Sequence, residues 1–385
     1  MADRYLKILM TDPHLRGGGQ VRYVANLAHE LTLLGHCVII GCKPGSVLVD
    51  RAHEAGCLYH DRFTFRGGLR PRAWLHDVAE IRRFIRAEQP DILHVSGSQD
   101  HWTLAIANRS IGRLVCLVRT RHNTYPVHDG LTNQILNRRW TDYQIVVCNV
   151  VRETLARQRA FDGSRMCSIH NGVDAEAFRP DEEARRRARA EFGYGDADLV
   201  CGIAARLVEA KGHEFLFHAA ASLKTEFPSL RLLVLGQGDK EPVLRKLVKD
   251  CAMEPIVNFA GFRDDMAYCV QAIDIGVQPS VDCDTSSFSL KEMMAAEKPV
   301  IASDYGGLKE IVADGVEGLV VATGEVEPLA QALRTLLRDP NLRATLGVAG
   351  RRRVLRDFTV QIFAARTAEA YQRAIEIHHE RTPNQ

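Results

Sequence analysis

The chain contains, at residues 200–212, the stretch VCGIAARLVEAKG. Its first five residues form an apolar run of the length expected for a buried strand, and two cations, Arg206 and Lys211, follow this run. Beyond Lys211 the apolar residues recur at helical spacing, at Leu216, Ala220, Leu223 and Phe227. A strand followed by a helix is the repeating unit of a parallel sheet that is covered by helices.

The same alternation extends in both directions from this stretch. Apolar runs of strand length lie at residues 6–10, 38–41, 92–95, 114–118 and 145–148, and then at 200–204, 232–235, 256–259, 273–277, 300–302 and 319–321. Longer segments with helical spacing separate them. The pattern predicts an α/β protein with two doubly wound sheets, each of which binds its ligand beyond the carboxyl ends of its strands.

The alternation of predicted strands and helices is interrupted after residues 171–174, where Pro180 and the charged stretch 181–191 follow. We therefore expect two Rossmann-like domains, residues 1–175 and residues 176–359, that face each other across a cleft. A chain of 385 residues exceeds what one hydrophobic core usually organises, which agrees with this division. The segment 358–377 is helical in period, but periodicity alone assigns it to neither domain.

The composition is that of an average soluble protein, with 46% hydrophobic residues, 25% charged residues and a formal net charge of only +2. This total charge gives no reason to expect nucleic acid as a partner. The longest stretch without a formal charge, residues 31–42, is too short to span a bilayer, and the first residues lack the pattern of a secretory signal. We expect a cytoplasmic protein whose scattered cysteines are reduced and form no zinc site.

A glycine-rich loop, Arg16-Gly17-Gly18-Gly19, follows the first predicted strand and precedes a helical pattern. Glycines let backbone amides approach a ligand, and a helix N-terminus presents unpaired donors to an anion or a sugar. The spacing is not that of a dinucleotide-binding fingerprint. A plain tight turn would also need glycines, so both interpretations stay open.

Arg206 and Lys211 emerge at the carboxyl edge of a predicted parallel sheet. A guanidinium fork and a compact ammonium suit the oxygens of a diphosphate. The alternative is a surface ion pair with Glu209 or Glu214. A second glycine turn that begins at Gly236 ends the next strand and is expected to line the same crevice.

Two carboxylates, Asp284 and Glu292, flank a segment rich in hydroxyl groups. If a helix begins near Ser287, its free amides can hold a phosphate oxygen, and Glu292 lies in its second turn. The alternatives are that Asp284 or Thr285 is a plain N-cap and that Glu292 is a solvated carboxylate. Their place after the run 273–277, at the same sheet edge as Arg206, favours a functional role.

The ordered set of these motifs resembles the retaining glycosyltransferases of family 4, also called glycosyl transferases group 1, which have the GT-B fold. The resemblance covers nearly the whole chain. It is carried by the glycine loop and Gly35-His36, by His170–Asp174 with Phe178 and Pro180, by Ala205–Gly212, by Leu235–Gly238, by Phe259–Phe262, and by Glu292–Ala295 through Lys298–Ser303 to Gly306–Val312.

The resemblance implies roles for particular residues. Arg206 and Lys211 match the pair that neutralises the donor diphosphate, and Glu292 matches the carboxylate that binds the donor ribose. The remaining candidates for donor binding are Gly18, Gly19, Gly236, Phe262, and the residues whose amides meet the distal phosphate, Ser287 and Phe288.

Two further matches concern the transferred sugar and the end of the chain. His122 matches the histidine that the family places beside the transferred sugar, with a buried or capping histidine as the alternative. Asp284 stands where the family normally has glutamate, and Thr285, Ser286 and Ser287 replace its usual glycines and phenylalanine. We therefore count His122 and Asp284 as candidate catalytic residues beside Arg206 and Lys211. The last helix, about 360–385, is expected to cross back onto the first domain.

The resemblance implies a hexosyltransferase-like enzyme that moves a sugar from a nucleotide-diphosphate-sugar to an acceptor hydroxyl with retention, in bacterial cell-surface glycan or glycolipid synthesis. The nucleotide sugar is a substrate, and no cofactor or metal ion is expected. An alternative from another class is a non-catalytic subunit that binds a sugar nucleotide. A sugar-nucleotide epimerase or a phosphorylase of similar architecture is the other alternative.

The segment 62–74 mixes four arginines with Phe63, Phe65, Leu69 and Trp74 and contains no acidic residue. That composition is typical of a segment at an anionic membrane surface, and it predicts peripheral contact with the inner face of the membrane. The alternative is a solvated loop whose aromatic rings pack into the first domain or which grips an anionic soluble acceptor.

Overall fold

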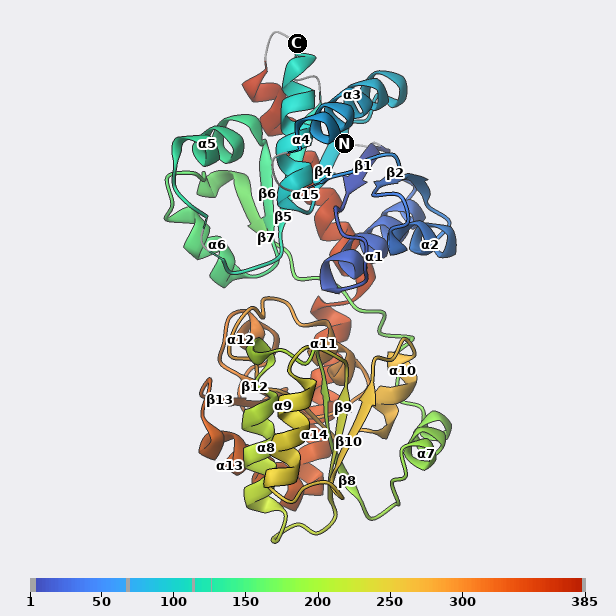
Figure 1. Ribbon diagram of the computed structural model, residues 1–385, viewed down its shortest axis with the longest axis vertical. Coiled ribbons are helices and arrows are strands. Elements are labelled where there is room, and N and C mark those ends of the chain that lie inside the picture. Colours follow the sequence, from blue (N-terminus) through green and yellow to red (C-terminus); the bar gives the residue numbers. More distant parts are fainter. Residues whose placement is uncertain (1–4, 67–69, 113–114, 126, 383–385) are drawn as a thin grey trace. The chain divides into compact units, whose positions relative to one another are not determined.

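The computed structural model describes residues 5–66, 70–112, 115–125 and 127–382. The chain divides into two compact units, unit 1 (residues 1–172 and 360–385) and unit 2 (residues 173–359). Each unit is built on one parallel sheet with helices on both of its faces (Figure 1).

The sheet of unit 1 has seven strands in the order β3-β2-β1-β4-β5-β6-β7. They are β1 (Lys7–Thr11), β2 (Cys37–Gly41), β3 (Leu58–His60), β4 (Ile92–Val95), β5 (Cys116–Arg121), β6 (Tyr143–Val146) and β7 (Met166–Ser168). The direction of the crossovers reverses between β1 and β4, which pair from Ile8 opposite Ile92 to Thr11 opposite Val95. Ligands of doubly wound sheets bind at such a switch point.

The helices of unit 1 include one that is distant in sequence. They are α1 (Gly19–Leu33), α2 (Val47–Glu54), α3 (Pro71–Glu88), α4 (Ser98–Ser110), α5 (Leu131–Gln134), the π-helix η1 (Ile135–Trp140), α6 (Asn149–Ala156), the 3₁₀ turn η2 (Gly163–Arg165) and α15 (Val360–Arg381). In Figure 1 the red helix α15 lies beside α1, where the rings of Phe363 and Tyr23 meet with their centroids 4.8 Å apart.

The sheet of unit 2 has six strands in the order β10-β9-β8-β11-β12-β13. They are β8 (Leu199–Ala204), β9 (Leu230–Leu235), β10 (Val257–Gly261), β11 (Ile275–Gln278), β12 (Val300–Ser303) and β13 (Gly318–Val321). The switch point lies between β8 and β11. The helices and turns are α7 (Glu182–Glu191), η3 (Glu209–Lys211), α8 (His213–Leu223), α9 (Glu241–Asp250), α10 (Met266–Cys269), η4 (Val270–Ala272), α11 (Phe288–Ala295), α12 (Leu308–Ile311), α13 (Val326–Arg338) and α14 (Pro340–Asp357).

The predicted fold class is confirmed, and the predicted strands match the observed ones closely in unit 2. All six runs predicted there are strands. The four inner strands, β9, β8, β11 and β12, are mostly buried, and strands covered on both faces read as continuous apolar runs. Two strands of unit 1, β3 and β7, escaped the prediction. Each has only three residues, and two of the three in β3 are exposed, so no apolar run marks it.

Candidate functional site

In unit 2, the predicted cations stand at the carboxyl end of β8, beside the switch point. Arg206 lies two residues after β8, and its guanidinium is exposed and has no hydrogen-bond or ion-pair partner among the residues that the structure describes. Lys211 lies at the end of η3, and only Gly212, the N-cap of α8, separates it from that helix. The fold therefore presents an unpaired guanidinium at the sheet edge where a doubly wound domain binds its ligand.

Lys211 is paired with the candidate carboxylate that follows β11. Its Nζ lies 2.9 Å from Asp284 Oδ2, and both side chains are largely buried. Glu209 instead pairs with Lys240, at 3.2 Å. The surface ion pair with Glu209 or Glu214 that was the alternative for Lys211 is thus not observed in the described structure.

Asp284 is the centre of a buried hydrogen-bond network. Besides Lys211, its Oδ2 accepts from Gln278 Nε2 at 3.0 Å and from Ser280 Oγ at 2.7 Å. The expectation that Asp284 or Thr285 caps the next helix is wrong, because Ser287 is the N-cap of α11 and its Oγ accepts from Leu290 N. The Oδ2 atom of Asp284 is thus directed at Lys211, Gln278 and Ser280.

The helix α11 begins at Phe288, directly after Ser287, so the condition that a helix begins near Ser287 is met. Glu292 therefore lies in the second turn, and it is only 1% exposed, so the alternative of a solvated carboxylate is wrong. Its neighbour Lys291 is fully buried, donates from Nζ to Ser286 Oγ at 2.7 Å and lies over the ring of Phe358. Sequence reasoning missed Lys291, although a charged pair within an otherwise apolar helix was a signal of burial.

The loop after β9 packs tightly against the loop that carries Arg206. Gly236 has φ +139°, and a Cβ atom there would lie 2.0 Å from the carbonyl oxygen of Ala205. Only glycine fits such an approach. Phe262 follows β10 at the same edge, two strands away from β8, and it is 66% exposed. Gly236 is thus brought next to Arg206, whereas Phe262 stands at the periphery of this set.

In unit 1, the glycine loop joins β1 to α1 beside the switch point. Gly18 is the N-cap of α1 in extended backbone, and Cβ atoms added at Gly17, Gly18 or Gly19 would meet nothing within 4 Å. A tight turn therefore does not explain these glycines, because neither a left-handed conformation nor a close contact requires them. The loop is shaped by the buried Asp12, whose carboxylate accepts from His14 N and Gln20 Nε2, both at 2.7 Å.

His122 directly follows β5 and packs edge-on against the ring of Tyr23, with centroids 4.6 Å apart. Desolvation and the nearby Arg119 cation hold the pKa of His122 well below its usual range, so the ring is neutral at pH 7. Tyr23 in turn hydrogen-bonds Thr120, at 3.1 Å. The structure thus places His122 at the same sheet edge as the glycine loop.

Beneath this edge lies a buried chain of hydrogen bonds that sequence reasoning did not find. His94 Nε2 lies 2.6 Å from Thr120 Oγ1, and His94 Nδ1 lies 2.6 Å from the hydroxyl of Tyr371 on α15. Burial lowers the pKa of His94 to about 3. The chain ties α15 to the strands of unit 1 through a neutral imidazole.

The segment 62–74 is only partly the exposed surface that the sequence predicts. Phe63 and Phe65 are buried in the core of unit 1, which is the alternative that the composition left open, so neither ring can contact a membrane. Residues 67–69, Leu69 among them, lie outside the described residues. The segment's exposed residues include Trp74 and the arginines Arg62, Arg66, Arg70 and Arg72. None of the described helices is long and apolar enough to cross a membrane.

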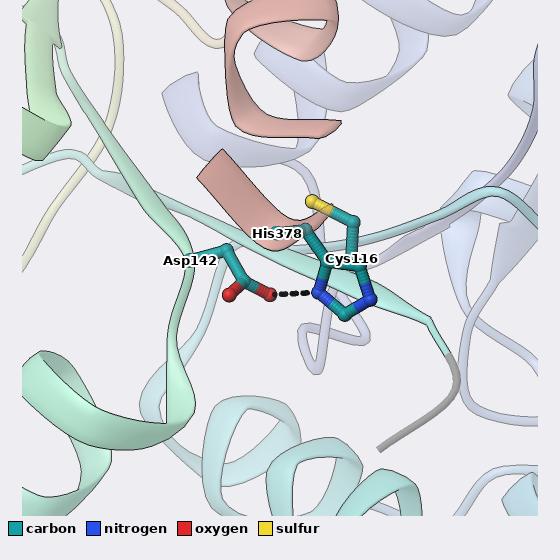
Figure 2. Close-up of side chains that lie close together, drawn as sticks. All are labelled: Cys116, Asp142 and His378. Carbon is teal, nitrogen blue, oxygen red and sulfur yellow. Dashed lines mark hydrogen bonds and ion pairs between the residues drawn. The ribbon is translucent and has the colours of Figure 1, made fainter. Parts of the chain in front are cut away.

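One group of side chains in unit 1 has the spacing of a metal site. Atoms of Cys116, Asp142 and His378 lie within 4.8 Å of one another (Figure 2). The carboxylate of Asp142, however, also accepts from Leu117 N and from Arg381 Nη1, both at 3.0 Å. A guanidinium on the same carboxylate opposes a second cation. We therefore interpret Asp142, which directly precedes β6, as a hydrogen-bonded link between α15 and β5. That the chain has no metal site remains a prediction.

Comparisons with known proteins agree with the resemblance seen in the sequence. Residues 17–177 match the family described as Glycosyltransferase Family 4, and residues 184–353 match the family described as Glycosyl transferases group 1. The D-inositol 3-phosphate glycosyltransferase of Pseudarthrobacter chlorophenolicus is 30% identical over 331 residues, which are 79% of this chain and 76% of that protein.

Two other relatives match a smaller part. EpsD of Bacillus subtilis, named as a glycosyltransferase, is 34% identical over 50% of this chain and 51% of its own length. The GDP-mannose-dependent alpha-(1-6)-phosphatidylinositol monomannoside mannosyltransferase of Mycolicibacterium smegmatis is 32% identical over 58% of this chain and 61% of its own. The chain therefore spans only half to three-fifths of the length of these two relatives.

Solved structures share the fold over the full length. The crystal structure of a glycosyltransferase from Rickettsia africae has a TM-score of 0.84 and 21% identity, and the match covers 99% of this chain and 100% of that one. The structure of Anabaena HepE in complex with UDP-glucose has a TM-score of 0.83 and 20% identity, covering 96% and 100%. With the two Rossmann-like sheets, these matches give the GT-B fold, and the chain belongs to glycosyltransferase family 4, the glycosyl transferases group 1.

Proposed function

We propose that this glycosyltransferase moves a hexose from a nucleotide-diphosphate-sugar to an acceptor hydroxyl with retention at the anomeric carbon. In this proposal unit 2 binds the donor and unit 1 binds the acceptor. The observation that carries it is the placement of Arg206 and Lys211 beside the switch point of unit 2, near the N-terminus of α11.

The departing diphosphate explains why these groups suit the reaction. Negative charge builds up on it as the glycosidic bond breaks, so fixed cations and amide donors stabilise the transition state more than the ground state. We assign the guanidinium of Arg206 and the ammonium of Lys211 to the diphosphate. The amides of Ser287 and Phe288 at the start of α11 would meet the distal phosphate. The buried carboxylate of Glu292 would accept from the donor ribose.

Residues of unit 1 are assigned to the sugar in this proposal. His122 follows a strand of unit 1 and is held neutral, so its ring can share a hydrogen bond with a sugar hydroxyl. Gly18 and Gly19 leave open backbone at the start of α1, where a sugar or a phosphate can approach. Gly236 lets the loop after β9 pack against the backbone at Arg206. Phe262 would lie at the edge of the nucleotide-binding region.

The relatives suggest the class of donor and acceptor. The mannosyltransferase from Mycolicibacterium is named for GDP-mannose and a phosphatidylinositol mannoside, and HepE was solved with UDP-glucose. We propose a nucleotide hexose as donor and a glycan or glycolipid acceptor, in cell-surface glycan synthesis at the cytoplasmic face of the membrane. The exposed arginines before and within α3, with Trp74 and Leu75, would contact anionic lipid.

Thermal unfolding with a panel of nucleoside diphosphates tests the donor site. A ligand that binds only the native state raises the apparent stability of the protein. We expect one nucleotide to raise Tm and its hexose conjugate to be hydrolysed slowly without acceptor. Arg206→Ala should abolish both effects. A nucleotide that binds while no nucleotide sugar is ever cleaved would instead support the non-catalytic binding subunit.

Membrane contact has a separate test, co-sedimentation with vesicles that contain anionic lipid. Each exposed arginine near such a surface contributes on the order of 1 kcal/mol, so binding should weaken at high salt. A variant with Arg66, Arg70 and Arg72 changed to serine should lose most of the binding at low salt. Equal binding by this variant would remove the segment from the proposal.

A further inference from the structure

A cavity of about 880 Å³ lies in unit 1 between η1, η2 and the last turns of α15. Its residues precede strands rather than follow them: Arg165 stands directly before β7, and η1 ends just before β6. Because all strands of the sheet are parallel, this is the edge opposite to the glycine loop and His122. The cavity is therefore separate from the candidate site of unit 1.

Two guanidinium groups of the cavity wall are fixed by the end of the π-helix. Arg165 Nη2 donates to the carbonyl of Arg138 at 2.7 Å, and Arg381 Nη2 donates to the carbonyl of Arg139 at 2.7 Å. Each also meets a carboxylate, Arg165 that of Asp162 and Arg381 that of Asp142. These contacts hold both cations in place before any ligand arrives, which reduces the entropy that binding would cost.

Two further arginines supply charge that is not neutralised nearby. Arg138 and Arg139 are adjacent in η1, both are exposed, and neither forms an ion pair with a described carboxylate. The cavity is lined by five arginines, of which Arg165, Arg373 and Arg381 are paired with Asp162, Glu376 and Asp142. The remaining two, Arg138 and Arg139, stand against one further acidic residue of the lining, Glu380. A concave site with this excess of positive charge favours an anion.

The side chains that line the cavity indicate which class of anion it binds. Arginine forks match the oxygens of phosphate in geometry as well as charge, and the volume is that of a site for a small molecule or a lipid headgroup. The apolar side chains of Leu131, Ile135 and Ile377 share the lining. We propose that this cavity binds a phosphate-bearing ligand, supplied either as a soluble phosphate ester or as the headgroup of a lipid.

Calorimetric titration with pyrophosphate tests the site on the full chain. The Arg206→Ala protein serves as background, since it lacks the exposed cation of the candidate donor site. In that background Arg138→Ser with Arg139→Ser should weaken binding at least tenfold. The matched control is Arg186→Ser with Arg187→Ser, two adjacent exposed arginines on α7, which removes the same charge and should leave the affinity within twofold. Glu380→Gln removes an acidic side chain from the wall and should tighten binding.

Vesicles of phosphatidylcholine with and without phosphatidic acid distinguish the two sources of phosphate. A loss of vesicle binding in the Arg138 and Arg139 variant that exceeds the loss in the control variant would identify a lipid headgroup. Weakened pyrophosphate binding without that loss would identify a soluble ester. No pyrophosphate binding to the background protein, or equal weakening by the two serine pairs, would overturn the proposal.

Discussion

Replacing Lys211 with alanine tests how the candidate donor site is held together. The ammonium lies 2.9 Å from Asp284, and the two side chains are 14% and 6% exposed. Removing one partner of a buried ion pair costs about 3–5 kcal/mol, because the other charge stays buried without compensation. Gln278 and Ser280 still donate to Asp284, so we expect the lower end of that range, about 3 kcal/mol.

The stability assay is calorimetric unfolding of the full chain. For a domain of 150–250 residues each kcal/mol moves Tm by about 2–4 °C, so the transition of unit 2 should fall by roughly 6–12 °C in Lys211→Ala. Arg206→Ala is the matched control. Its side chain is exposed and unpaired within the described structure, so its free energy of unfolding should change by less than about 0.5 kcal/mol.

Activity measurements test the proposed catalytic role of Lys211 separately from its structural contacts. Loss of one fixed donor to the departing diphosphate typically costs about 10²–10³ in turnover, so both alanine variants should be severely impaired. Adding Asp284→Asn to Lys211→Ala removes the uncompensated carboxylate and should restore most of the stability but none of the turnover. A native Tm for Lys211→Ala, or recovered turnover in the double variant, would refute this reasoning.

Three further predictions use other features of the two units. Gly236→Ala should cost about 3 kcal/mol in denaturant unfolding, because its Cβ would strike a carbonyl oxygen, whereas Gly261→Ala, whose site is open, should cost about 1 kcal/mol. Asp284→Glu restores the residue usual in the family and should change the preference among donor sugars, measured as relative kcat/KM; an unchanged preference and rate would leave Asp284 only its structural contacts. His94 has its pKa lowered to about 3 in the folded state, so its contribution to stability is complete above about pH 6.5 and is lost as the pH falls toward 3. His94→Gln should flatten the dependence of unfolding free energy on pH in that window, and parallel curves for the two proteins would contradict the assignment.

The sequence predicts the candidate site best where the argument depends on strand ends. Carboxyl ends of parallel strands meet at one edge, so Arg206 after β8, Gly236 after β9 and Asp284 after β11 had to share it. The start of α11 was predicted only approximately: hydroxyl residues favour caps, but Asp284 and Thr285 were named as the candidate caps, whereas the N-cap is Ser287.

The sequence could not predict which side chains from different strands pair with each other. Lys211 and Asp284 stand 73 residues apart, and nothing local states that they meet. Composition also failed for Phe63 and Phe65, since a ring beside arginines can face a membrane or fill a core with the same neighbours in sequence. The contact of Lys211 with Asp284 and the burial of Phe63 and Phe65 both depend on the packing of elements that are distant in sequence.

The contacts of the loop around Asp284 explain how an aspartate can stand where the family normally has glutamate. The backbone of Asp284 is pinned at its carbonyl oxygen, which accepts from Gly307 N at 3.2 Å and would lie 2.3 Å from a Cβ atom at Gly306. Its side chain is pinned by Lys211. The two contacts fix the position of Asp284, which precedes the N-cap of α11, relative to the ammonium of Lys211. A preorganised site requires these groups to keep a fixed relative position. We therefore interpret Asp284 as the residue that links Lys211 to the start of α11. The short side chain of aspartate is long enough for this role.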